Sequence, residues 1–286
     1  MEPVRLPVTE HDALQAQHYP AHAETRLYRS VIMGPATAVA QTYYTKFCTY
    51  LAEQGFDVLS FDFRSVGQSL LRPIRDYADI GFSDWAEHDY PAVIEAMHTL
   101  HPNQPLYIVG HSVGGWMPGA TRASHRIDGI LGVAALSAYW PLMSRPHRYG
   151  HWLTWNTLVP MTTSFLGYWP GWAGLTHDLP AKLGREFAQW AQLPGFLFDA
   201  PQFDARGNAA NFNGHLHLYQ IADDAWGTPE AVSALQPHYP NAKSNVMETL
   251  EPGDFGSKKI GHLDFFRSAH RDTLWPHAVQ RLKEFG

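Results

Sequence analysis

Short apolar runs rich in β-branched residues alternate with amphipathic stretches along most of the chain. The runs with strand character are residues 27–33, 56–61, 106–109, 127–136, 216–221 and 244–250. The helical patterns are residues 41–54, 83–100, 229–238 and 263–285, together with a helix that ends near residue 124. Gly55 stands at a C-cap position and Ser83 at an N-cap position. This alternation predicts an α/β fold with a mainly parallel, twisted sheet and helices on both faces.

The alternation stops between residues 139 and 212. This segment holds six of the ten tryptophans and seven prolines. A crossover between neighbouring parallel strands needs only about a dozen residues, so roughly sixty are surplus. We therefore expect an inserted, aromatic-rich cap at 139–212, with a helix near 179–192, on a core formed by residues 1–138 and 213–286.

Composition and charge exclude several classes of protein. The chain has 286 residues, of which 45% are hydrophobic, and a net charge of −6. This acidic balance argues against a nucleic-acid binder or an anionic-membrane binder. The single cysteine, Cys48, excludes a disulfide framework and a cysteine-based metal cluster, and it favours a reducing compartment.

We also expect no secretion signal and no membrane-spanning segment. The start of the chain, residues 1–5, has no basic region followed by an apolar core. The uncharged run 129–144 contains Gly132 and Pro141 and is too short to span a bilayer. We expect a cytoplasmic protein without membrane insertion, and nothing in the pattern specifies an oligomeric state.

The strongest chemical signal is the segment Gly110-His111-Ser112-Val113-Gly114, which lies between a predicted strand and a predicted helix. G-x-S-x-G in this setting is typical of a nucleophile elbow, a strained turn that lifts the serine hydroxyl above the sheet. The N–H of Val113 is then placed to stabilise an oxyanion. The alternative is a glycine-rich turn that merely closes a βα unit. His111 is expected to pack in the core.

A serine nucleophile needs a base, and the base needs an orienting acid. In proteins with a G-x-S-x-G elbow, the acid follows the serine along the chain and the histidine comes last. Asp224 and Asp223 follow the strand 216–221; we favour Asp224, with Asp223 as the alternative, and one of the two acts as a turn former. His262 opens the last predicted helix, whereas His270 and His277 lie inside it.

Other site residues are less strongly indicated. The second oxyanion donor should come from the loop after the strand 27–33, where Pro35 has no N–H, which leaves Ala36 or Thr37. An ordinary βα turn is the alternative there. Trp152 and Trp155 are candidates for an acyl pocket, with packing anchors as the alternative.

Several segments together carry a family resemblance. They are residues 62–69 (Asp-Phe-Arg-Ser-Val-Gly-Gln-Ser), 110–115, Asp223-Asp224 with Pro229, and 261–266 (Gly-His-Leu-Asp-Phe-Phe). On these segments the chain resembles the α/β-hydrolase superfamily over nearly its whole length. Within it, the chain is similar to bacterial predicted hydrolases related to the serine-aminopeptidase and monoacylglycerol-lipase-like group. The resemblance implies that fold and no settled substrate.

The chain departs from the family pattern in two places. Met33-Gly34-Pro35 stands where the family commonly has a His-Gly pair, which affects the second oxyanion donor. Pro118 falls in the first turns of the helix after Ser112 and should bend it. Residues 62–69 are expected to form a structural loop near the site, in which Arg64 pairs with an internal carboxylate.

These observations lead to a functional hypothesis. We expect a serine hydrolase that cleaves a carboxylic ester or related acyl bond: Ser112 attacks, His262 transfers the proton, and Asp224 orients His262. The substrate is a small, apolar acyl compound, and the chemistry needs no cofactor and no metal. Two alternatives are the same elbow used for acyl transfer, C–C cleavage or lyase chemistry, and a non-catalytic small-molecule binding protein.

Overall fold

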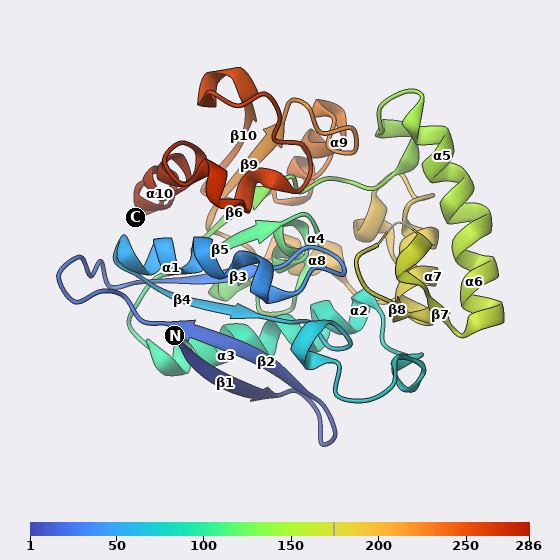
Figure 1. The fold of residues 1–286 in the computed structure, drawn as a ribbon, viewed down its shortest axis with the longest axis horizontal. Helices are drawn as coiled ribbons and strands as arrows, with labels where there is room; N and C mark the ends of the chain where they lie inside the picture. Colours follow the sequence, from blue (N-terminus) through green and yellow to red (C-terminus); the bar gives the residue numbers. More distant parts are fainter. Residues whose placement is uncertain (174) are drawn as a thin grey trace.

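The computed structural model describes residues 1–173 and 175–286, and within them eight strands form one sheet (Figure 1). The strand order is β1-β2-β4-β3-β5-β6-β9-β10. β1 (Glu2–Pro7) and β2 (Ala13–Tyr19) are antiparallel, and the strands from β4 to β10 are parallel to one another. These are β3 (Arg29–Gly34), β4 (Phe56–Phe61), β5 (Leu106–His111), β6 (Gly129–Val133), β9 (His215–Ile221) and β10 (Ser244–Leu250). The predicted mainly parallel sheet is confirmed.

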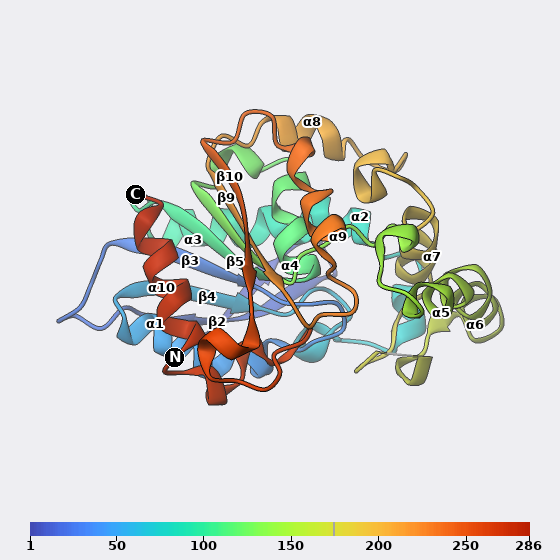
Figure 2. The same cartoon turned by 90° about the horizontal axis from the view of Figure 1, so that it is seen from above.

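Both faces of the sheet are buried under helices. Successive residues of the central strands face opposite sides: Val31 and Met33 pack in one core and Ile32 in the other. The helices α1 (Thr45–Glu53) and α10 (Leu274–Glu284) cover one face, and α3 (Tyr90–Leu100) covers the other (Figure 2). This two-sided burial explains why the central strands are continuous apolar runs.

The N-terminal hairpin of β1 and β2 was not predicted. β1 is the edge strand, and within it only Leu6 is buried. Because an edge strand faces solvent on most sides, its sequence lacks the apolar run that marks a central strand.

Several predicted helices are shorter or more interrupted than their patterns suggest. The pattern 83–100 is built from α2 (Phe82–Asp84), a π-helical turn and α3. The N-cap of α2 is Gly81, so Ser83 lies inside the helix, where its N–H and hydroxyl both donate to Glu186. The pattern 229–238 is α9 (Pro229–Ser233) with a 3₁₀ turn. The last helix was predicted to begin near His262, but α10 begins at Leu274 and 3₁₀ turns precede it.

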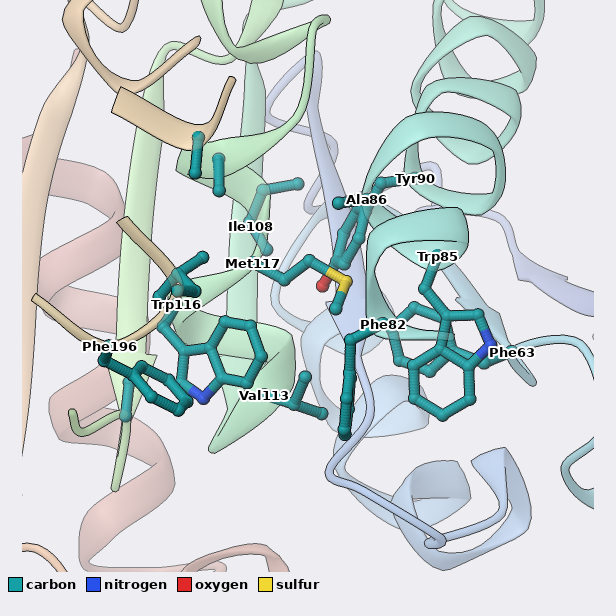
Figure 3. Close-up of a cluster of buried hydrophobic side chains, with 14 of the residues drawn as sticks. Phe63, Phe82, Trp85, Ala86, Tyr90, Ile108, Val113, Trp116, Met117 and Phe196 are labelled. Atoms are coloured by element: carbon teal, nitrogen blue, oxygen red, sulfur yellow. The ribbon is translucent and has the colours of Figure 1, made fainter. Parts of the chain in front are cut away.

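The helix after Ser112 is also short. α4 (Val113–Trp116) is a single turn, and Pro118 then begins a 3₁₀ turn, because a proline cannot continue the hydrogen-bonding pattern of an α-helix. The side chains of Val113 and Trp116 point into a buried aromatic cluster (Figure 3). In this cluster the rings of Phe63 and Trp85 stack with their centroids 4.2 Å apart. The short helix is therefore anchored in the core by its side chains.

The loop at residues 62–69 is held by buried charges. Arg64 pairs with the buried Asp89, with Nε and Oδ1 2.6 Å apart, as the sequence indicated for an internal carboxylate. The carboxylate of Asp62 accepts hydrogen bonds from the backbone N–H groups of Gln41 and Gln68.

The aromatic-rich cap lies between β6 and β9. Its helices are α5 (His147–Leu153), α6 (Val159–Leu166), α7 (Ala181–Trp190) and α8 (Ala205–Ala210), with β7 (Tyr168–Trp169) and β8 (Leu179–Pro180) pairing as a small antiparallel ribbon. In Figure 2, α5, α6 and α7 gather at the end of the molecule away from α10. Among the described residues, no helix combines the length and the apolar character that a membrane crossing requires.

Candidate active site

Ser112 lies on a strained turn between β5 and α4. Its backbone has φ 53° and ψ −114°, a conformation that non-glycine residues rarely adopt. The two motif glycines allow the close approach of the chain that this turn requires. A Cβ atom at Gly110 would lie 2.0 Å from the carbonyl oxygen of Gly114, and one at Gly114 would lie 2.1 Å from that of Gly34. The local geometry is thus that of the predicted elbow.

Two other loops bring Asp224 and His262 together. Asp224 follows β9, and His262 follows β10, so both leave the carboxyl edge of the parallel sheet. The Nδ1 of His262 and Oδ2 of Asp224 are 2.7 Å apart. Burial raises the pKa of the Asp224 carboxyl, but hydrogen bonds and the charge of His262 outweigh it and hold the pKa below its usual value. Asp224 is therefore an anion that can orient the imidazole and stabilise its protonated form.

The neighbouring Asp223 has a different contact. Its two carboxylate oxygens accept the backbone N–H groups of Ile260 and Gly261, at 3.0 and 2.8 Å. Asp223 thus fixes the backbone of the loop that carries His262, while Asp224 contacts the ring. Of the two alternatives for the acid, the contact with the imidazole belongs to Asp224.

A buried hydrogen-bond chain connects the three loops of the site. The Nε2–H of His111 donates to the backbone carbonyl of His262, 2.7 Å away. This leaves Nδ1 as an acceptor for the Tyr44 hydroxyl at 2.8 Å, which in turn accepts the N–H of Ala36 at 3.0 Å. Burial, reinforced by the charge of His262, lowers the pKa of His111 to about 3, so the ring is neutral. His111 is buried, as expected, and it also links the elbow to the histidine loop.

The hydrogen-bond chain distinguishes between the two candidates for the second oxyanion donor. Ala36 and Thr37 both line the pocket, but the N–H of Ala36 already donates to Tyr44. The Ala36 alternative is therefore corrected: its donor is occupied, and Thr37 is the one we retain. Val113 is the first residue of α4, where a backbone N–H has no intrahelical partner.

Ser112 and His262 share one pocket of about 450 Å³. Its walls are mostly apolar and aromatic, and they include Trp116, Trp155, Trp169, Phe187 and Trp226. The two tryptophans predicted for this pocket differ. Trp155 lines it, whereas Trp152 is 44% exposed and is not part of the lining, so the prediction for Trp152 is wrong. The reason is helical geometry: adjacent positions on a helix face different directions, and His151 and Trp155, four residues apart, share a face.

Trp226 was not predicted as a site residue. Its backbone N–H donates to Oδ1 of Asp224 at 2.9 Å, and its ring lies against that of His262, with the centroids 5.3 Å apart. The only sequence signal for it is its position two residues after the candidate acid. Tyr44 ends the 3₁₀ turn that precedes α1, and it carries no such signal, because it reaches the site through the packing of that segment on the sheet.

One group of potential metal ligands lies at the opposite edge of the sheet. His18, Asp57 and His101 converge there, with the Nε2 atoms of the two histidines 3.3 Å apart. However, Arg26 pairs with the Asp57 carboxylate, which also accepts from the N–H of Ala21 and the side chain of Gln104. An arginine on the only carboxylate opposes a cation, so we describe this group as a structural hydrogen-bond network.

Comparison with known proteins places the chain in a family. The family model described as serine aminopeptidase, S33, matches residues 32–186, more than half of the chain. Solved structures share the fold at low identity. The soluble variant of monoglyceride lipase from Saccharomyces cerevisiae, in complex with a substrate analogue, is 14% identical; the match covers 100% of this chain and 95% of that one, with a TM-score of 0.70.

Two esterases have similar folds. Est1E from Butyrivibrio proteoclasticus, bound to ferulic acid, is 15% identical, covers 99% and 98% of the two chains, and has a TM-score of 0.62. A thermostable carboxyl esterase from Bacillus coagulans, in complex with glycerol, is 14% identical, covers 99% and 98%, and has a TM-score of 0.65. A search of curated proteins found no match. The family match over more than half of the sequence, together with the sheet and the cap, shows that the chain belongs to the serine aminopeptidase S33 family of the α/β-hydrolase superfamily.

Proposed function

We propose that this hydrolase is a serine esterase that cleaves carboxylic esters through an acyl-enzyme formed on Ser112. The observation that carries the proposal is the shared pocket: Ser112, on its strained turn, and His262, hydrogen-bonded to the anionic Asp224, line the same cavity. A serine hydroxyl becomes an effective nucleophile when an adjacent base accepts its proton. The esterases and the lipase among the structural neighbours support an ester as the bond that is cleaved.

In the first half of the reaction, the Ser112 Oγ attacks the ester carbonyl carbon while Nε2 of His262 accepts the hydroxyl proton. The carbonyl oxygen becomes an oxyanion, which the N–H groups of Val113 and Thr37 stabilise. Collapse of this intermediate expels the alcohol, and His262 returns the proton to the leaving oxygen. The acyl group remains bonded to Ser112.

In the second half, water attacks the acyl-enzyme and His262 accepts its proton. The tetrahedral intermediate collapses, the carboxylic acid leaves, and the proton returns to Ser112. Asp224 stays ionised throughout and stabilises the imidazolium that forms in each half. Because Asp224 bonds Nδ1, the ring keeps Nε2 directed toward the reacting atoms.

The cap supplies the acyl-binding walls in this proposal. We take it as residues 139–212, inserted between core segments 1–138 and 213–286. Trp155, Trp169 and Phe187 come from the cap and line the pocket together with Trp116 and Leu136 of the core. The aromatic lining favours a bulky, apolar acyl group, because the transfer of such a group from water into an apolar pocket lowers the free energy.

The test is turnover of a panel of nitrophenyl and methyl esters by the wild-type protein and by Ser112→Ala, with acid and alcohol quantified separately. The proposal expects equal amounts of acid and alcohol from the wild-type protein, and a loss of about 10⁶-fold in kcat for Ser112→Ala. Added alcohol acceptors distinguish hydrolysis from acyl transfer. Turnover that survives Ser112→Ala would contradict the proposal. So would a reaction whose main product is the new ester formed by acyl transfer to the added alcohol.

A further inference from the structure

The pocket beside Ser112 contains few polar side chains on its walls. Apart from Ser112 and His262, the polar residues among its described lining are Thr37, His151, Thr154 and Thr176. The hydroxyl of Thr154 donates to the carbonyl of Gly150, and that of Thr176 donates to the carbonyl of Ala38. Two of these four side chains therefore already donate their hydroxyl protons to backbone carbonyls.

Two of the indoles that line the pocket, those of Trp155 and Trp169, offer no polar atom to a ligand. The Nε1 atoms of Trp155 and Trp169 are buried, and within the described part of the chain they have no hydrogen-bond partner. The two rings pack edge to face, with centroids 5.7 Å apart and an interplanar angle of 88°. Their N–H groups are thus enclosed in ring packing, and these residues present carbon to the pocket.

His151 differs from its neighbours. It lies on the pocket face of α5, with its ring nearly parallel to that of Trp155 and edge-on to that of Trp226, at centroid distances of 6.2 and 4.9 Å. Neither ring nitrogen is among the buried atoms without a partner, and within the described residues neither makes a hydrogen bond to the protein, so both nitrogens are open to a ligand.

The position of His151 relative to the site is fixed by Trp226. That ring contacts the rings of both His151 and His262, with centroid distances of 4.9 and 5.3 Å. His151 and the candidate base therefore both lie in contact with the same indole. A polar atom that meets His151 would belong to a substrate group about one aromatic ring away from the ester carbonyl.

We propose that His151 is a specificity-determining residue, and that the preferred substrate is an ester whose bulky, apolar acyl group carries a hydrogen-bonding oxygen about one ring width from the carbonyl. This inference rests on the proposed esterase function. Burial lowers the pKa of His151, with a further contribution from His147, which keeps the imidazole neutral. A neutral imidazole has one donor and one acceptor, so it pairs with a hydroxyl in either direction.

The selection has a physical basis. An acyl group without the oxygen leaves the imidazole of His151 desolvated and unpaired when the substrate closes the pocket. A site that hydrogen-bonds one substrate group discriminates strongly against an analogue that lacks it, whereas apolar walls discriminate weakly between ligands of similar size. His151 is therefore expected to determine the polarity of the acyl group, and the aromatic walls its bulk.

The experiment compares kcat/KM for matched ester pairs that differ by one hydroxyl, such as methyl 3-(4-hydroxyphenyl)propanoate and methyl 3-phenylpropanoate. The wild-type protein should prefer the hydroxylated member by about fivefold or more. His151→Phe keeps a planar ring against Trp155 and Trp226 but removes both nitrogens, and it should bring the ratio close to one. His151→Gln restores a donor and an acceptor and should recover part of the preference.

The chain offers a matched control on the same helix. His147 is exposed at the start of α5, so His147→Phe makes the same chemical change outside the pocket and should keep the wild-type ratio. A wild-type ratio near one, an unchanged ratio in His151→Phe, or a preference that follows a hydroxyl on the alcohol side would each overturn the proposal. Labelling of Ser112 by a fluorophosphonate separates this failure from failure of the esterase function, because labelling does not depend on the acyl group.

Discussion

The ring of His111 donates its Nε2–H to the backbone carbonyl of His262, with the two atoms 2.7 Å apart. The residue beside the candidate nucleophile therefore positions the candidate base. The other ring nitrogen accepts a hydrogen bond from the hydroxyl of Tyr44, which accepts one from the N–H of Ala36 in the loop after β3. A displacement of any one loop is thus transmitted to the other two through buried hydrogen bonds, and this makes the geometry of the site sensitive to residues that never contact the substrate.

Tyr44→Phe tests this chain of hydrogen bonds directly. The substitution leaves the N–H of Ala36 and Nδ1 of His111 buried without partners, at a cost of about 1–3 kcal/mol for each unsatisfied group. We expect a lower free energy of unfolding and a kcat that falls by more than KM changes, because the chain positions catalytic groups. Urea unfolding and steady-state kinetics measure the two effects. Tyr50→Phe, in the helix α1 that directly follows Tyr44 but outside the hydrogen-bond chain, is the control and should keep kcat.

The two adjacent aspartates should respond differently to removal of their charge. Asp224→Asn keeps the size of the side chain but favours the wrong tautomer of His262, and we expect kcat to fall by about 10⁴. Asp223→Asn weakens the hold on the N–H groups of Ile260 and Gly261, so the fall in kcat should be about tenfold to a hundredfold, with a lower melting temperature. Equal losses of kcat in the two variants would contradict the division of roles.

His111 predicts a pH dependence of stability. Its pKa is lowered to about 3 in the folded protein from an ordinary value of 6.5. Between these two values the unfolded chain binds a proton at this residue that the folded chain does not. The stability contributed by the neutral ring is therefore complete above pH 6.5, and it is lost as the pH falls, by about 1.4 kcal/mol per pH unit.

Urea unfolding of the wild-type protein and of His111→Gln between pH 4 and 7 measures this contribution. Other buried histidines, such as His217, also lower stability in acid, so the difference between the two proteins is the relevant quantity. Below pH 6.5 the free energy of unfolding should fall more steeply with decreasing pH for the wild-type protein than for His111→Gln. The difference in slope should reach about 1.4 kcal/mol per pH unit, which corresponds to one proton. Parallel curves would show that His111 is protonated equally in both states.

Trp155 and Trp152 are three residues apart but should have different effects on selectivity. Trp155 is buried in the pocket wall against Phe187, so Trp155→Ala should enlarge the pocket, shift the preference toward bulkier acyl groups, and cost about 3–5 kcal/mol of stability. Trp152 is exposed, and Trp152→Ala should leave the selectivity unchanged and the stability within about 0.5 kcal/mol. An ester series of increasing acyl length, read as kcat/KM, distinguishes the two.

Much of the fold could be predicted because the central strands are buried on both faces. The central strand 56–61 has the predicted bounds, and the elbow follows its predicted strand. The edge strand 244–250 also has the predicted bounds, although it is only partly buried. The edge strand β1 escaped prediction because only Leu6 within it is buried, so it carries little hydrophobic pattern. Helix bounds were less accurate because 3₁₀ turns, π-helical turns and prolines divide helices whose periodicity continues across the break, as at Trp85–Asp89 and at Pro118.

The candidate site divides in the same way. Ser112, Asp224 and His262 could be proposed from chain order, because the parallel sheet determines where each loop leaves it. Tyr44 and His151 could not, since each reaches the site through packing between elements distant in the sequence. Trp152 was misassigned because composition identifies a tryptophan-rich segment but does not show which face of a helix is buried.

The most direct test of the account is active-site labelling of Ser112. The folded wild-type protein is treated with a fluorophosphonate and analysed by intact and peptide mass spectrometry, beside Ser112→Ala and His262→Ala. We predict one adduct per chain on the peptide that contains Ser112, none in Ser112→Ala, and greatly slowed labelling in His262→Ala, because His262 activates the hydroxyl. An unlabelled wild-type protein, or labelling at the wild-type rate without His262, would contradict the claim that these two residues act together.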